Sequence, residues 1–367
     1  MSYYGEKGGL SFRDNFCEEI NIVEISEIAE LGELLGSVFK SIAIGTDEFS
    51  RISEIHTLAG GMSRSGADVF IVNDVMPVFK YGIRSLECEC GVYIAGEKKL
   101  RILFFDEYGI EMAEKGIVKI FSEKISENLS KNIQSDLSEK RGTVSQVSHI
   151  REVYINSLEN MIKENFSHNA VISCGNRRLS EIWRNFFHTD KSDLIFQVSE
   201  DGGRVNCYST DFGFVSYERL VLACSAMRWQ NGKKVILPKN FHYAGENLAE
   251  KMKADFEYLN ERNHREAFEE KFISDALCLC IELMNTGRSI PDIMKNLPEF
   301  YTAKREIVTD FSMRDSEKTL FSPEGRINLS KTGKNRITLT VQSMSMETAS
   351  ELCGKWERLI LEKNKKC

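Results

Sequence analysis

Residues 42–96 read IAIGTDEFSRISEIHTLAGGMSRSGADVFIVNDVMPVFKYGIRSLECECGVYIAG, and this stretch decides the fold class. Its short apolar runs are typical of buried strands. Segments with apolar residues at helical spacing separate these runs. The expected strands are 41–44, 67–72 and 91–94, and the expected helices are 52–64 and 77–86. Strands that alternate with helices indicate βαβ units and a mostly parallel sheet.

The same alternation continues outward from this stretch. A helix is expected over 20–40 and a fourth strand over 101–105, and residues 112–165 are polar and mostly helical, with a long helix over 146–163. A second α/β unit follows. Its expected elements are the strands 170–174, 193–198 and 204–209 and the helices 178–188 and 216–230.

The rest of the chain gives weaker patterns. One clear strand, 234–237, is followed by two expected helices, 244–260 and 265–287, and a linker at 296–299. The tail predicts two strands, 326–329 and 337–341, and a last helix over 346–363. We therefore expect a third unit with little sheet and a small C-terminal α+β module.

Composition bounds the class of protein. The 367 residues carry a formal net charge of −7, which disfavours a dedicated nucleic-acid binder because such proteins usually have a basic excess. The N-terminus lacks the pattern of a signal peptide, and no apolar run reaches the length of a membrane span. None of the ten cysteines forms a C-x-x-C pair. These features predict a reduced, cytoplasmic protein without membrane or nucleic-acid partners.

Laid end to end, these elements resemble the α-D-phosphohexomutase superfamily, which includes phosphomannomutase, phosphoglucomutase and phosphoglucosamine mutase. The stretches that carry the resemblance are 42–96, 170–176, 199–222 and 274–306. The resemblance implies consecutive α/β/α domains, the third one truncated, and a small C-terminal α+β domain. The implied ranges are 1–145, 146–230, 231–298 and 299–367.

In that family, the resemblance implies a reversible phosphoryl shift between C1 and C6 of a hexose. A phosphoserine donates the phosphoryl group, Mg²⁺ bridges it to a loop of three aspartates, and a basic loop of the last domain holds the distal phosphate. A transferring phosphoryl group spreads negative charge over its oxygens, so catalysis rests on positioning and charge neutralisation. Each of these parts can be compared with this sequence.

The serine loop of the family reads T-A-S-H-N-P, and its counterpart here is Ala-Gly-Glu-Lys-Lys at 95–99. Glu97 stands at the position of the phosphoserine, followed by Lys98 and Lys99 as further candidates for the site. No residue of this loop has a hydroxyl group, so a phosphoenzyme is not expected there. A carboxylate at 97 could imitate part of the phosphoserine charge. The alternative is a solvated loop residue.

The metal loop of the family reads D-G-D-x-D-R, and residues 199–204 here read SEDGGR. The middle aspartate, Asp201, and the closing arginine, Arg204, are the positions that match. Loss of the other two carboxylates removes most of the charge that would hold a dication. We therefore expect no cofactor, and Mg²⁺ only if activity is retained. The alternative reading of this stretch is a plain turn.

The two sugar-phosphate loops also depart from the family. The G-E-x-S-G stretch that contacts sugar hydroxyls has no counterpart here. In place of R-P-S-G-T-E-P the tail has residues 329–336, where Leu329 replaces the key arginine. The interval keeps hydroxyls, a glycine and cations that suit an anion. The candidate phosphate-binding residues are Ser330, Lys331, Thr332, Gly333, Lys334 and Arg336; the alternative is a basic surface hairpin.

The losses coincide at the serine, metal, sugar and phosphate loops, whereas the strands are intact. The resulting hypothesis is a pseudoenzyme of carbohydrate metabolism that binds a hexose phosphate or a protein partner in sugar metabolism. The alternatives are an active, divergent phosphomannomutase or phosphoglucomutase and a structural subunit with no ligand.

Overall fold

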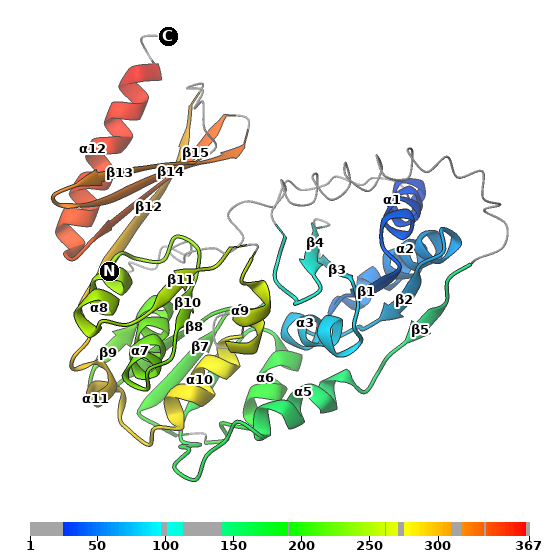
Figure 1. The fold of residues 1–367 in the computed structure, drawn as a ribbon, viewed down its shortest axis with the longest axis horizontal. Coiled ribbons are helices and arrows are strands. Elements are labelled where there is room, and N and C mark those ends of the chain that lie inside the picture. Colours follow the sequence, from blue (N-terminus) through cyan, green and yellow to red (C-terminus); the bar gives the residue numbers. More distant parts are fainter. Residues whose placement is uncertain are drawn as a thin grey trace. The chain divides into compact units, whose positions relative to one another are not determined.

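The computed structural model describes residues 25–96, 101–112, 141–189, 191–260, 262–270, 275–309, 317–333 and 335–364 (Figure 1). They form two compact units. The N-terminal unit comprises the described residues of 19–224 and 259–292, and the C-terminal unit comprises those of 225–258 and 293–367. This division into two units does not test the four predicted domain ranges, which stay predictions.

The N-terminal unit begins with a five-stranded sheet in the order β4-β3-β1-β2-β5. Every neighbouring pair is parallel except β3 and β4, so the prediction of a mostly parallel sheet is confirmed. The strand β5 lies at the start of the helix predicted over 146–163 and just before it, and was not predicted; the helix α5 is shorter than predicted. The bounds are β1 (Ser41–Gly45), β2 (Asp68–Ile71), β3 (Cys90–Ala95), β4 (Arg101–Asp106), β5 (Val144–Gln146) and α5 (Ile150–Glu159).

Helices cover both faces of this sheet. The chain leaves β1 toward β2 on one side and returns from β2 to β3 on the other, and right-handed crossovers then place α2 and α3 on opposite faces. Glycines let α1 approach α2 closely: a Cβ at Gly36 would lie 2.3 Å from the Met62 carbonyl oxygen. The bounds are α1 (Ile25–Val38), η1 (Phe49–Arg51), α2 (Ile52–Arg64) and α3 (Met76–Ser85).

A second sheet of the N-terminal unit has the order β6-β7-β8-β9. The pair β6 and β7 is parallel, and the other pairs are antiparallel. Aromatic rings of Trp183, Phe187 and Phe196 pack together beneath it. The bounds are β6 (Val171–Cys174), β7 (Leu194–Val198), β8 (Val205–Ser209), β9 (Gly213–Val215), α6 (Arg177–Arg184), α7 (Tyr217–Gln230), α9 (His264–Glu270) and α10 (Ala276–Met284).

The C-terminal unit contains a small parallel sheet of β10 (Val235–Leu237) and β11 (Phe256–Tyr258) beside α8 (Ala244–Met252). The predicted helix over 244–260 is therefore wrong in its second half. Lys253 takes a left-handed conformation (φ 53°) that ends α8, and the Phe-Glu-Tyr run after it pairs with β10. A further short helix, α11 (Ile290–Met294), lies at the boundary between the two units.

The tail forms a four-stranded antiparallel sheet in the order β12-β15-β14-β13 with the helix α12. The prediction had two of these strands and the helix. It missed β12, which carries four charged or threonine side chains among its eight residues, and β13. The bounds are β12 (Tyr301–Val308), β13 (Glu317–Ser322), β14 (Gly325–Gly333), β15 (Arg336–Ser343) and α12 (Met346–Asn364).

Among the residues described, no helix combines the length and the apolar character needed to cross a membrane.

Candidate functional site

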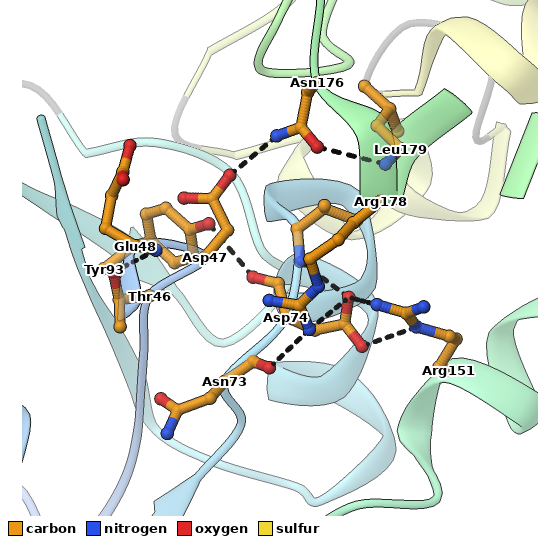
Figure 2. A network of polar contacts seen from close by, with 11 residues as sticks. Thr46, Asp47, Glu48, Asn73, Asp74, Tyr93, Arg151, Asn176, Arg178 and Leu179 are labelled. Carbon is orange, nitrogen blue, oxygen red and sulfur yellow. Dashed lines mark hydrogen bonds and ion pairs between the residues drawn. The ribbon is translucent and has the colours of Figure 1, made fainter. Parts of the chain in front are cut away.

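The candidate site lies where β1 and β2 end. The loops after these neighbouring parallel strands lead to helices on opposite faces of the sheet, and in open α/β sheets ligands commonly bind at the carboxyl edge where connections diverge in this way. Polar residues come directly after both strands: Thr46 and Asp47 after β1, and Asn73 and Asp74 shortly after β2. Figure 2 shows that Asp47 reaches Asn176, and that Asp74 reaches Arg151 of α5 and Arg178 of α6.

Asp74 is the centre of this polar network. Its carboxylate accepts two hydrogen bonds from Arg151 of α5, at 2.8 and 2.6 Å, and lies 3.5 Å from the guanidinium of Arg178. The Arg178 guanidinium also donates to the Asn73 carbonyl at 2.9 Å. Hydrogen bonding to Asp74 raises the pKa of Arg151. Asp74 is buried, so this charge is held by its two arginine partners rather than by water.

Asp47 connects the same edge to the second sheet. Its carboxylate accepts a hydrogen bond from the side-chain Nδ2 of Asn176 at 2.9 Å. The side-chain Oδ1 of Asn176 caps α6 by accepting from the backbone N–H of Leu179. Tyr93 of β3 donates its hydroxyl to the Asp74 carbonyl at 3.0 Å, and burial raises its pKa well above the usual range. The strand ends are thus tied to α5 and α6 (Figure 2).

The predicted metal loop folds as a turn that closes on itself. The Ser199 amide donates to the Arg204 carbonyl at 3.0 Å, and the Gly202 amide donates to the Ser199 carbonyl at 2.9 Å. Asp201 accepts from the Ser199 hydroxyl at 2.5 Å and from the Gly203 amide at 3.0 Å. Asp201 and Arg204 lie in one turn, but the carboxylate oxygen Oδ1 of Asp201 is used by the turn itself.

The turn at 199–204 packs against the start of α3 and against α6. Gly202 has φ +69°, and a Cβ there would lie 2.6 Å from Pro77 at the start of α3 and 3.2 Å from Leu179 of α6. A glycine is required for both the conformation and the close approach. The position that the resemblance assigns to a metal loop is therefore adjacent to the strand-end network.

The predicted serine loop is described at its first residues. Gly96 has a left-handed conformation (φ 94°), and its carbonyl accepts two hydrogen bonds from Arg51, at 3.0 and 2.9 Å. Arg51 is also paired with Glu54 at 2.8 Å. Glu97, Lys98 and Lys99 lie outside the described residues, so their predicted roles stay predictions.

The predicted phosphate loop is the tip of the β14–β15 hairpin in the C-terminal unit. Ser330 pairs with Thr338, Lys331 with Ile337, and Gly333 with Arg336, with a β-bulge between Lys331 and Gly333. Lys331 and Arg336 are exposed. Thr332 and Gly333 belong to β14, and Lys334 lies outside the described residues. Leu329, at the position of the family's arginine, is buried in the core of this sheet.

Metal-ligand clusters and reactive cysteines are the next features of the described residues. Within these parts of the chain, no group of three His, Cys, Asp or Glu side chains is placed to hold a metal ion. The described cysteines are free thiols and mostly buried. Burial raises the pKa of Cys88 and of Cys207 to about 12, so neither is a thiolate near neutral pH.

A cavity of about 40 Å³ lies in the N-terminal unit, with room for a few water molecules. Lys80, Tyr154 and Asp275 are among its lining residues, and Tyr154 donates to Asp275 at 2.6 Å. Burial lowers the pKa of Lys80, while nearby carboxylates, first Asp275, act in the opposite direction. The lining of the cavity thus includes one basic side chain, Lys80, and one acidic side chain, Asp275.

Sequence reasoning missed most of the strand-end network. A signal existed for Asp47 and Asp74, because each follows a buried strand by a few residues and adjacent parallel strands bring such residues together. Nothing in the local sequence marks Arg151, Asn176 or Arg178 as their partners. These contacts depend on how α5 and the second sheet pack.

No protein-family model matches the sequence, and a search of curated proteins finds no match. Solved structures do match. A Thermus thermophilus protein described as a phosphomannomutase has a TM-score of 0.64 at 13% identity, over 94% of this chain and 96% of that one. A phosphoglucomutase/phosphomannomutase family protein of Burkholderia thailandensis has a TM-score of 0.66 at 11% identity, over 94% and 95%.

A third match is parafusin, a phosphoglucomutase of Paramecium in its open form, with a TM-score of 0.56 at 11% identity over 92% of this chain and 91% of that one. All three cover nearly the full length of both chains. The chain therefore has the fold of the α-D-phosphohexomutases.

Proposed function

We propose that this protein has the phosphohexomutase fold without the mutase chemistry, and that it serves carbohydrate metabolism by binding a hexose phosphate or a protein partner. The observation that carries the proposal is the closed turn at 199–204. The family's metal loop needs several carboxylate oxygens directed at one cation. Here one aspartate is present, and one of its oxygens accepts two hydrogen bonds from within the turn.

The strand-end network supports the same proposal. Phosphoryl transfer needs cations that can neutralise the charge of the transferring group. Arg151 and Arg178 instead surround the buried carboxylate of Asp74. A phosphate group entering this edge would have to compete with a carboxylate that already satisfies both arginines.

The C-terminal hairpin supports the binding role. Lys331 and Arg336 are exposed cations near the tip of the hairpin. Cations and backbone amides at a tight turn attract phosphate oxygens. In the family, the loop at this place in the chain holds the distal phosphate of the sugar, so a phosphate bound here would occupy the corresponding position.

Two assays test the proposal. The first follows the phosphate shift with glucose 1-phosphate or mannose 1-phosphate, the matching 1,6-bisphosphate and Mg²⁺. We expect no turnover, and turnover that Arg204→Ala abolishes would establish the active, divergent mutase instead. The second measures the melting temperature with millimolar hexose phosphates, which should rise if the folded protein binds them. A flat response with every sugar phosphate would remove the hexose-phosphate role.

The protein-partner role and the cytoplasmic location belong to the same proposal. Pull-down from the native cells, followed by fractionation, tests both. We expect this protein to be recovered in the cytoplasmic fraction together with an enzyme of sugar metabolism. Recovery with a membrane or nucleic-acid fraction would contradict it.

A further inference from the structure

One face of the β6–β9 sheet carries an unusual row of side chains. Val171 pairs with Ile195, Ile195 with Tyr208, and Tyr208 with Phe214, so these four residues cross the sheet in one line. Because side chains alternate along a strand, they all project from the same face. We call this row with its polar neighbours the aromatic platform.

The platform is open on the outside. Tyr208 is 49% exposed and Phe214 is 58% exposed. The opposite face of the same strands is the buried one, where Phe196, Cys207 and Val215 are nearly inaccessible. The two rings lie opposite each other on adjacent strands, so they form one exposed apolar patch that a ligand can cover.

The polar neighbours of the rings are uncharged. One step along the strands on the same face lie Ser173, Gln197 and Asn206, which are register partners of one another. The strand positions on this face therefore offer aromatic and aliphatic surface together with amide and hydroxyl groups. Such a surface complements a ligand that combines C–H faces with hydroxyl groups and carries no charge.

From this geometry we infer that the aromatic platform binds a neutral glycan, with pyranose rings stacked on Tyr208 and Phe214. The two rings are directly opposed across neighbouring strands, where side chains are typically about 5 Å apart at Cβ. Adjacent rings at this spacing can support consecutive sugar units of one chain. Gln197 and Asn206 lie one step away, within reach of sugar hydroxyls.

The dimensions and charge of the face disfavour the other occupants. Four strands of three to five residues each give a face of less than roughly 300 Å², whereas a stable protein interface needs about 800 Å² from each partner. Single-stranded nucleic acid also stacks on aromatic rings, but its recognition needs a positively charged groove. The strand residues of this face have no cation among them.

Native gels that contain a soluble neutral glycan test this inference. The probes are an α-glucan, a β-glucan and a mannan, with plain gels as reference. We expect at least one glycan to retard the full-length protein. Tyr208→Ala and Phe214→Ala should each weaken binding about tenfold or more, and Tyr208→Phe should restore it because the stacking ring is kept.

Phe49→Ala is the matched control, since Phe49 is an exposed ring of η1, outside the strands that carry the aromatic platform (89% exposed). This variant should keep wild-type retardation, and unchanged melting temperatures should show that all four variants fold. Absence of retardation by every glycan overturns the inference, as does retardation that the two alanine variants retain. A shift with a short single-stranded RNA in place of the glycans, or a dimer in sedimentation that Tyr208→Ala dissociates, also overturns it.

Discussion

Two regions contain charged side chains that differ in their surroundings. In the strand-end network, formed by Asp47, Asp74, Arg151, Asn176 and Arg178, the charged groups are paired with one another or with polar groups, whereas at the tip of the β14–β15 hairpin they are exposed. At the strand ends, the cations Arg151 and Arg178 surround the buried Asp74. At the hairpin tip, Lys331 and Arg336 extend into solvent from paired strands. The charged groups of the strand-end network connect the two sheets of the N-terminal unit, whereas those of the hairpin tip are accessible to a ligand.

This difference separates charged residues that hold the fold together from charged residues that are accessible to a ligand. Residues at the strand ends contribute to stability through contacts between elements, so their substitution should affect folding. Residues at the hairpin tip contribute little to folding, so their substitution should affect ligand binding. Substitutions in the two regions separate these effects, from the largest expected change to the smallest.

Asp74→Ala should give the largest change. It leaves two partly buried arginines without their carboxylate, and removal of one partner of a buried ion pair costs about 3 kcal/mol or more. Urea unfolding at neutral pH measures the loss. The control is Glu181→Gln, which breaks the exposed Arg177–Glu181 pair and should cost less than about 0.5 kcal/mol. Equal costs for the two variants would contradict a structural role of Asp74.

Acid should destabilise the C-terminal unit through His242. Burial lowers the pKa of this fully buried imidazole to about 4. The unfolded histidine titrates near 6.5, so between these values the unfolded state binds a proton that the folded state does not. Stability should fall as the pH drops from 6.5 to 4, by about 3 kcal/mol from this group.

The pH dependence of urea unfolding measures this loss, with His242→Gln as the comparison. The variant should show a shallower slope between pH 6.5 and 4, even if its stability at neutral pH is lower. Parallel slopes for the variant and the parent protein would show that His242 does not carry the acid response.

Gly202→Ala should cost about 2 kcal/mol. The left-handed conformation is unfavourable for alanine, and the new Cβ would lie 2.6 Å from Pro77. Gly232→Ala is the control, because Gly232 has the same φ of +69° with nothing within 4 Å of a Cβ. The difference between the two unfolding free energies isolates the packing of the 199–204 turn against α3. Equal costs would mean that this turn does not pack there in solution.

Alanine at both Lys331 and Arg336 should give the smallest change in stability, within about 0.5 kcal/mol, because both side chains are exposed. The same variant should lose the rise in melting temperature that hexose phosphates produce in the parent protein. A rise of the same size in the double variant would place the phosphate elsewhere.

Sequence reasoning reached the fold because the decisive signals are local. Short apolar runs between helical segments gave the order of elements, and the parallel sheet β1–β3 follows from it. Sequence reasoning failed where contacts between residues far apart in the chain determine the structure. The strand β11 was assigned to a helix because the left-handed turn at Lys253 leaves no clear mark in a charged segment.

The roles predicted for the site residues stay predictions. The stretches 199–204 and 330–336 were singled out by their resemblance to two loops of the family, and the turn and the hairpin that they form were the alternative readings. Asp74 escaped notice because its partners, Arg151 and Arg178, are 77 and 104 residues away in the chain. The charge balance that defines this region exists only after α5 and α6 have packed.

The central claim is that this fold carries no phosphoryl group through a catalytic cycle, and transfer of label tests it most directly. The protein is incubated with Mg²⁺ and glucose or mannose 1,6-bisphosphate labelled at both phosphates, and protein-bound label is counted after denaturation. We expect no covalent label above that of heat-denatured protein. Stoichiometric label on one residue, discharged by unlabelled hexose monophosphate, would contradict the claim.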